Sequence, residues 1–241
     1  MKRILFILLS VVCITTAGAQ DIEEEKTEEK EKVAATLGID LVNQYIWRGQ
    51  DLGFVSIQPT LGIGYKGLSL STWGSVGIAN ANDTKELDLT LSYTIKGFQL
   101  GVTDYWFSAG KYFQYRNSKT THIFEGFVGY DFGFLSAMWY TYFAGDDGTN
   151  KNDKRAYSSY FELAAPFRLG GLDWEAKVGV VPWYTTLYNT DGFAVTNISL
   201  KAAKVFTIKK KYELPVYVGL TTNPDAQKFY LLCGVAFSYK H

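Results

Sequence analysis

The charged side chains with the most informative spacing alternate with apolar residues rather than clustering in a motif. Asp88 lies between two leucines, and Lys177 lies between Ala176 and Val178. Alternation of this kind puts charged groups on one face of a strand and apolar groups on the other. The set that shares this pattern comprises Asp40, Asp88, Glu125, Glu162, Asp173, Glu175, Lys177, Lys201 and Glu213. Such a face lines a water-filled path or is neutralised by pairing within the set, and the sequence leaves both interpretations open.

Arg48 belongs to the same face by parity, and we expect it to end the first strand near one rim. It follows Tyr45 and Trp47 and precedes Gly49. An arginine at a pore rim selects anions or orients a ligand. An arginine that pairs with an acid of the same face, or with a lipid phosphate, has a structural role instead. Both roles remain open.

A second cluster of interest is aromatic and lies in a polar connection. The residues are Tyr112, Phe113, Tyr115 and Arg116. Aromatic rings with an arginine stack well on sugars and planar ligands. We therefore treat these four residues as a candidate binding loop.

Catalytic and metal-binding patterns are weak in this sequence. His122 has no serine two residues later, and His241 is the terminal residue, so neither pairs with a nucleophile in the sequence. We interpret His122 as an interfacial histidine and expect no enzyme activity. The segment 145–153 is rich in aspartate but lacks the glycine and glutamate of a calcium loop, and no Cys/His cluster is present. We expect no metal and no cofactor.

The elements that position these residues are predicted to be strands. From Val33 onward the apolar period is two, and no stretch has comparable helical spacing. About twelve segments are expected, starting near Val33, Val55, Leu68, Leu87, Phe98, His122, Phe134, Tyr157, Leu172, Ala194, Tyr212 and Phe229.

The connections between these segments alternate in length. Short turns are predicted at 66–67, 96–97, 132–133, 170–171 and 209–211, where glycine supplies most of the positive φ values. Longer polar loops lie at 79–86, 108–121, 145–156, 182–192 and 222–228. Short turns on one side and long loops on the other are typical of outer-membrane barrels, with the short turns in the periplasm.

The apolar face is predicted to contact lipid rather than a protein core. Aromatic residues gather on it at strand ends, as in membrane girdles, and the set is Tyr45, Trp47, Tyr65, Tyr93, Phe98, Trp106, Phe132, Phe167 and Trp174. The opposite face is rich in Gly, Ser, Thr and charge, as a polar lumen requires. The sequence therefore predicts an all-β fold: a closed, antiparallel, up-and-down transmembrane β-barrel of about 12 strands. A soluble β-protein is the alternative.

The ends of the chain carry targeting signals. Residues 1–19 have the charged, apolar and small-residue regions of a cleaved signal peptide. Residues 20–32 form an acidic stretch that we interpret as a solvated periplasmic tail, and residues 33–241 form the barrel. The alternating C-terminal strand with a near-terminal aromatic resembles the signal read by the outer-membrane assembly machinery. Formal net charge is zero, which argues against nucleic-acid binding.

The segment from Tyr45 to Gly49, with 58–61 and 86–93, resembles the outer-membrane porins of the TorF type. The resemblance implies an outer-membrane barrel and a porin role. We expect a narrow channel for small polar solutes, surrounded by outer-membrane lipid, because twelve strands enclose a small lumen. The alternative is a non-conducting barrel that binds a ligand or has a structural role.

Overall fold

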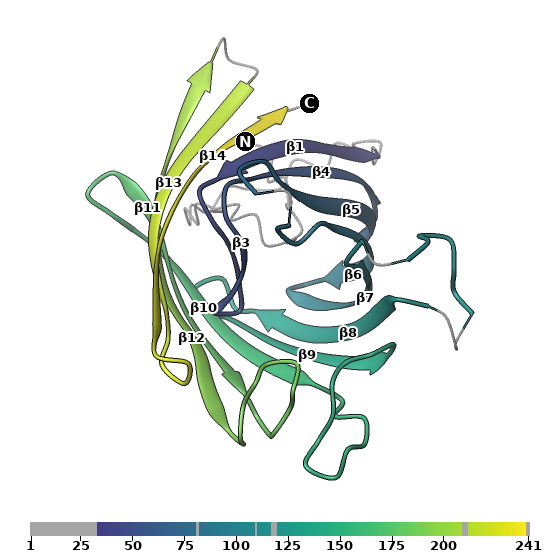
Figure 1. Cartoon of the computed structure of the whole chain (residues 1–241). Coiled ribbons are helices and arrows are strands. Elements are labelled where there is room, and N and C mark those ends of the chain that lie inside the picture. The colour runs from purple at the N-terminus through teal and green to yellow at the C-terminus, as the bar shows by residue number, and fades with distance from the viewer. Residues whose placement is uncertain (1–32, 81, 109, 117–119, 209–211, 240–241) are drawn as a thin grey trace.

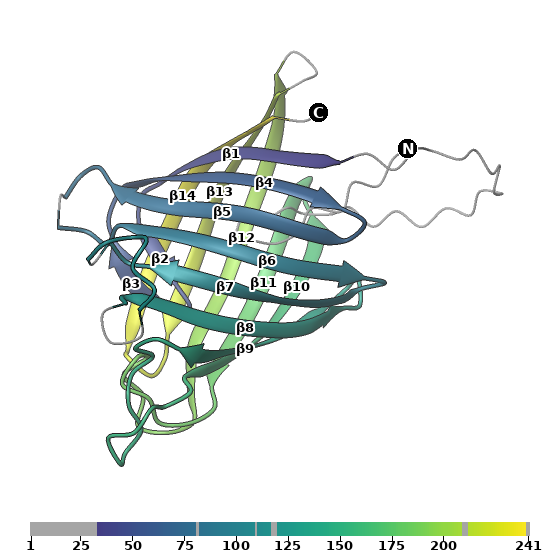
Figure 2. The same cartoon turned by 90° about the vertical axis from the view of Figure 1, so that its right-hand side faces the viewer.

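The computed structural model describes residues 33–80, 82–108, 110–116, 120–208 and 212–239, so the predicted signal peptide and acidic tail lie outside it. The described residues form a closed barrel of twelve strands and one short hairpin (Figures 1 and 2). The barrel strands are β1 (Ala34–Val42), β4 (Ser56–Tyr65), β5 (Leu68–Gly77), β6 (Glu86–Ile95), β7 (Phe98–Trp106), β8 (His122–Asp131), β9 (Ser136–Ala144), β10 (Ser159–Leu169), β11 (Leu172–Val181), β12 (Ala194–Ile208), β13 (Tyr212–Asn223) and β14 (Lys228–Tyr239). The hairpin consists of β2 (Tyr45–Trp47) and β3 (Gln50–Gly53), both within the connection from β1 to β4. No helix long and apolar enough to cross a membrane occurs in this part of the chain.

The barrel closes because its first and last strands pair. Each barrel strand is antiparallel to its neighbours, and β14 completes the ring on β1 from Gly38–Ser238 to Val42–Gly234. Closure satisfies the backbone N–H and C=O groups that lipid cannot satisfy at an open edge. The predicted all-β barrel of twelve strands is therefore confirmed, and each predicted strand begins within two residues of the observed one.

Short turns of a basic residue and glycine set the register of two hairpins. Lys66 and Gly67 have φ values of 50° and 84°, and Lys96 and Gly97 have values of 48° and 86°. Two successive positive φ values are the signature of a type I′ turn, whose twist matches that of paired strands.

The two faces of the wall differ as the alternation predicts. On β6, Asp88, Thr90 and Ser92 are buried on the inner face, whereas Leu91 on the outer face is 52% exposed. Exposed apolar residues recur at alternate positions on most of the other barrel strands, which is the surface that a lipid-spanning barrel presents. The chain is thus a transmembrane barrel of the outer-membrane type, and its location is the bacterial outer membrane.

Two expectations about the first strand are wrong. β1 ends at Val42, not at Arg48, and Tyr45 and Trp47 leave the wall instead of joining the aromatic girdle. Asn43 follows the end of β1 and is bonded to β14. Its side-chain amide donates to the Leu231 carbonyl at 2.8 Å, and its carbonyl oxygen accepts from the Cys233 N–H at 2.7 Å. These bonds fasten the end of β1 to β14, after which the chain turns into the barrel.

Candidate functional site

The β2–β3 hairpin crosses the lumen from one wall to the other. Figure 1, which looks into the barrel, shows β3 inside the ring of strands. On one side, the Tyr45 hydroxyl donates to Glu86 of β6 at 2.8 Å. On the other side, the Asn223 side chain donates to the Gly49 carbonyl at 3.1 Å. Gly49 has a φ of +80°, and a Cβ there would lie 1.8 Å from the Thr196 carbonyl oxygen. Only glycine therefore fits at this tip, which touches the wall opposite β6.

Arg48 at the hairpin tip forms a buried ion pair with β8. Its two terminal nitrogens lie 2.6 and 2.8 Å from the two carboxylate oxygens of Glu125. The side chains are 7% and 1% exposed, respectively. Tyr105 also donates to Glu125, at 2.8 Å. A bidentate arginine–carboxylate pair fixes both distance and orientation, so this contact holds the hairpin across the lumen.

Aromatic rings enclose the Arg48 guanidinium. Its central carbon lies 4.4 Å from the ring centroid of Trp47, 4.3 Å from that of Tyr140 and 4.7 Å from that of Tyr160. Cation–π attraction is strongest in such desolvated settings. Tyr188, from the connection between β11 and β12, stacks on Trp47 and accepts a hydrogen bond from Arg48 at 2.6 Å. Burial raises the pKa of the Tyr188 phenol, so this side chain stays a neutral hydroxyl. Arg48 is thus enclosed rather than presented at an open rim. It pairs with an acid of the inner face, Glu125, which is one of the two roles that the sequence left open.

A second charged group lies on the inner face of β10 and β11. Lys177 lies 3.5 Å from Glu162 and 3.3 Å from Glu175, and Tyr160 donates to Glu162 at 3.1 Å. Arg168, which is 63% exposed, lies 3.5 Å from Asp173. The inner charges of this wall are therefore largely compensated by one another.

The remaining predicted lining residues lie on the same inner face without joining the Arg48 cluster. Asp40 pairs in register with Gln58, Lys201 lies over the Tyr217 ring, and Glu213 is on the face of β13 that carries Tyr217. Asp88 is buried on β6, and its Oδ1 has no hydrogen-bond partner among the described residues. The strand parity thus groups these residues correctly, although their role in lining a pore stays a proposal.

The candidate binding loop and His122 lie on the outer side of the wall. Leu89 of β6 is paired with Asp104 of β7, and Trp106 of β7 with His122, so Asp104 and His122 face outward. Figures 1 and 2 show the β7–β8 connection outside the ring, at the end of the barrel with the long loops. The His122 Nδ1 lies 2.7 Å from Asp104, and its Nε2 lies 2.5 Å from the Tyr112 carbonyl.

His122 is fully buried beneath this loop, and its interpretation as an interfacial histidine stays a prediction. The Tyr115 hydroxyl donates to Asp104 at 3.0 Å, which adds to the cover. Phe113, by contrast, is 89% exposed, and Arg116 is exposed as well. Tyr112 and Tyr115 thus contact the His122–Asp104 pair, and a ligand-binding role of the loop stays a proposal.

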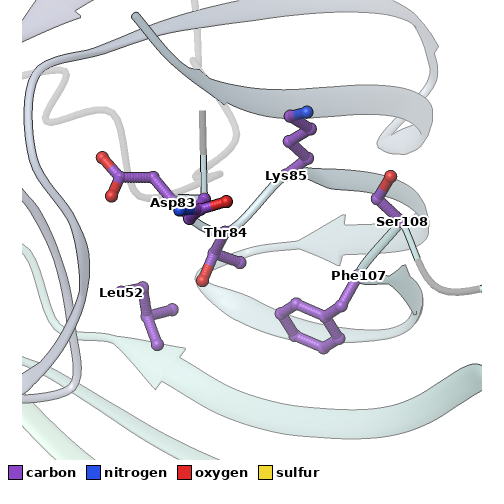
Figure 3. A pocket seen from close by; sticks show the side chains of 7 residues that line it. Leu52, Asp83, Thr84, Lys85, Phe107 and Ser108 are labelled. Atoms are coloured by element: carbon purple, nitrogen blue, oxygen red, sulfur yellow. The ribbon is translucent and has the colours of Figure 1, made fainter. Parts of the chain in front are cut away.

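An open cleft that the sequence did not predict lies at the mouth beside the hairpin. Its volume is about 520 Å³, and its lining residues are Leu52, Asn82, Asp83, Thr84, Lys85, Phe107 and Ser108 (Figure 3). Asp83 accepts from the Phe54 N–H at 2.8 Å, which fastens the base of the hairpin to the β5–β6 loop. The cleft is lined by two apolar side chains, one carboxylate, one cation, two hydroxyl groups and one amide.

No metal centre is found in the described part of the chain. No group of three His, Cys, Asp or Glu side chains there is arranged to hold a metal ion. In the aspartate-rich segment, Asp147 accepts from the Ser158 N–H at 3.0 Å and pairs with Arg155 at 3.2 Å. That carboxylate has a role in loop structure.

Comparisons with known proteins support the fold. No family model matches the chain, and no curated protein matches it significantly. Among solved structures, it is similar to the NanC porin, with a TM-score of 0.51, 8% identity, and coverage of 85% of this chain and 100% of that one. A bacterial polysaccharide outer membrane secretin gives a TM-score of 0.45 at 10% identity, covering 86% of this chain and 98% of that one. An outer membrane channel from Pseudomonas putida F1 gives 0.39 at 13% identity, covering 90% and 99%. The comparison with the NanC porin supports the barrel fold.

Proposed function

We propose that this protein is a narrow porin-like channel for small polar solutes, constricted near its outer mouth by the β2–β3 hairpin. The observation that carries the proposal is the charged and polar inner face of a barrel whose outer face is apolar. A polar lumen holds water, and water-filled lumens conduct small solutes. The Arg48–Glu125 pair limits the conductance of the channel, because it holds the hairpin across the lumen. The likeness to TorF-type porins, carried by Tyr45 to Gly49, is part of this proposal.

A non-conducting, ligand-binding barrel is the second candidate, and the cleft at the mouth favours it. Phe107 offers a ring for stacking, and Lys85 and Thr84 offer polar groups beside it. In this alternative the hairpin is a permanent plug and the cleft holds the ligand. Absence of enzyme activity, contact with lipid and recognition of β14 by the assembly machinery remain predictions under both candidates.

Removal of the hairpin separates the two candidates. Val42 and Ser56 pair directly in the barrel, so a short glycine–serine linker can replace residues 44–55 without opening the wall. We expect the purified full-length protein to give small single-channel conductance in planar bilayers. The shortened variant is expected to give events several-fold larger, because conductance grows with the free cross-section of the lumen.

The control shortens a loop that does not cross the lumen. Residues 150–154 of the β9–β10 connection form a tight turn with Asn150 at its start, and replacing them leaves the hairpin untouched. This variant should conduct as the wild type does. If folded, hairpin-deleted protein gives no channel events, the channel proposal fails and the binding barrel replaces it.

A further inference from the structure

The β7–β8 loop covers the hydrogen-bonded Asp104–His122 pair, which lies on the outer, lipid-facing side of the wall. Asp104 and His122 point toward the face on which Leu89, Leu91 and Val102 are exposed to lipid. Charged groups on the lipid face of a barrel are destabilising, by an amount that depends on depth. The pair is nevertheless buried, because Tyr112 and Tyr115 of the loop contact it.

The loop is anchored there by its own polar and aromatic groups. The Tyr112 carbonyl and the Tyr115 hydroxyl bond to His122 and Asp104, and the His122 N–H bonds to Thr120 at 3.1 Å. The Tyr115 ring lies 4.2 Å from the His122 ring. A loop held at four points on the outer wall has a fixed outward side.

The exposed residues of this loop include an aromatic ring with a cation on either side of it in the sequence. Phe113 is 89% exposed, and Lys111 and Arg116 are both exposed. The Phe113 ring lies 5.0 Å from the Tyr112 ring, which lies 5.4 Å from Trp106 on the outer face of β7, so the exposed ring adjoins the lipid interface of the barrel. Aromatic rings favour the level of lipid headgroups, and nearby lysine and arginine attract anionic lipid.

We infer that the surface of Lys111, Phe113 and Arg116 binds the phosphate-bearing headgroup of an anionic lipid at the outer rim of the barrel. The cations contact the phosphate, and the phenyl ring enters the interface beside it. The partner is a membrane lipid rather than a soluble anion, because the exposed Phe113 ring adjoins the lipid-facing wall through Tyr112 and Trp106. This inference is independent of conduction through the lumen.

Lipid retention tests the inference. The full-length protein is placed in vesicles of phosphatidylcholine with a small fraction of lipid A and is then extracted into mild detergent. Native mass spectrometry counts the lipid A molecules that remain on each barrel. Each lysine or arginine near an anionic membrane surface raises the binding affinity several-fold. The double variant Lys111→Ala/Arg116→Ala should therefore retain about tenfold less lipid A than the wild type.

The matched control removes two exposed lysines from another outer loop. Lys151→Ala/Lys154→Ala changes net charge by the same amount and should leave retention unchanged. Phe113→Ser should lower retention by a smaller factor. Heat-modified migration on gels establishes that every variant is folded. Equal retention by the wild type and the Lys111/Arg116 variant, or an equal loss in the control, overturns the inference.

Discussion

Two outer connections of this barrel fasten to opposite faces of the same strand. The β1–β4 connection reaches Glu125 on the inner face of β8, through Arg48. The β7–β8 connection covers His122 on the outer face of β8, through Tyr112 and Tyr115. Both connections combine tyrosine, a second aromatic residue and arginine, so their compositions are alike. The β8 residue that each loop contacts, Glu125 on the inner face or His122 on the outer face, decides whether the loop crosses the lumen or covers the wall.

The difference between the two loops is also one of enclosure. The inner loop encloses its arginine completely, and its charge is neutralised by a carboxylate. The outer loop buries a histidine and leaves its phenylalanine and arginine exposed. A barrel wall one residue thick thus supports two different elements. The β2–β3 hairpin is a plug on the inner side, and residues 110–116 are a strap on the outer side. The following variants separate the two roles, from the largest expected effect to the smallest.

Loss of the inner pair should have the largest energetic effect. Arg48→Ala leaves the buried Glu125 carboxylate without its cation, and breaking such a pair costs about 3–5 kcal/mol of unfolding free energy. Urea titration of the protein in lipid vesicles measures this. The double variant Arg48→Ala/Glu125→Ala should lose much less than the sum of the two single losses. Additive losses would mean that the pair does not hold the hairpin.

A charge placed on the outer face distinguishes the two sides of the wall directly. Leu91→Arg should lower the unfolding free energy by about 2–4 kcal/mol if it lies near the midplane. Ser71→Arg should cost less, because Ser71 lies on the inner face beside Gly62. Both are measured in the same vesicle titration. The reverse ranking would contradict the assignment of inner and outer faces.

Loss of the outer anchor should release the strap without opening the lumen. His122→Ala removes a buried hydrogen-bond partner of Asp104, which should lower the unfolding free energy by about 1–3 kcal/mol. Trypsin should then cleave after Lys111 and Arg116 faster than in the wild type, while single-channel conductance stays the same. Arg48→Ala should show the opposite combination. A change in both properties in either variant would mean that the two loops are coupled.

The smallest effect is expected from removing the hydroxyl of Tyr115, a half-exposed residue of the strap. Tyr115→Phe removes one hydrogen bond to Asp104, worth about 1 kcal/mol. Cleavage after Lys111 should rise by less than in His122→Ala. Tyr157→Phe, in another outer loop, is the control and should not change it. A Tyr115→Phe variant as protease-sensitive as His122→Ala would assign the anchor to tyrosine rather than histidine.

Alternation, together with the alternating connection lengths and the aromatic residues at strand ends, was enough to predict the barrel. The period of two fixes which residues of β6 face lipid, and glycine turns fix where its hairpins end. These are local properties of the chain, so they are readable without its partners. The lumen-facing set, including Glu125 and Lys177, follows from the same parity.

The plug was not predicted, although a local signal for it exists. Arg48 and Gly49 have φ values of 51° and 80°, nearly those of Lys66 and Gly67 in a barrel turn. A basic residue followed by glycine thus marks three hairpins, and the first was interpreted as the end of a strand. That this hairpin turns inward depends on Glu125, which lies 77 residues away. Contacts at that separation have no pattern in a single sequence.

The position of His122 shows the same limit on the outer side. Parity correctly separates it from Glu125, but only the fold of residues 110–116 shows that it is buried. Loop conformation depends on hydrogen bonds such as that from Tyr115 to Asp104, which alternation does not encode.

Reversal potentials under a salt gradient test most directly whether the Arg48–Glu125 pair lies in the conducting path. Arg48→Ala leaves an uncompensated acid there and should shift the channel toward cations. Glu125→Gln leaves an uncompensated arginine and should shift it toward anions. Both variants should conduct more than the wild type, and both shifts should shrink at 1 M salt, where the Debye length is about 3 Å. Reversal potentials that match the wild type in both variants, or that shift in the same direction, would contradict the account.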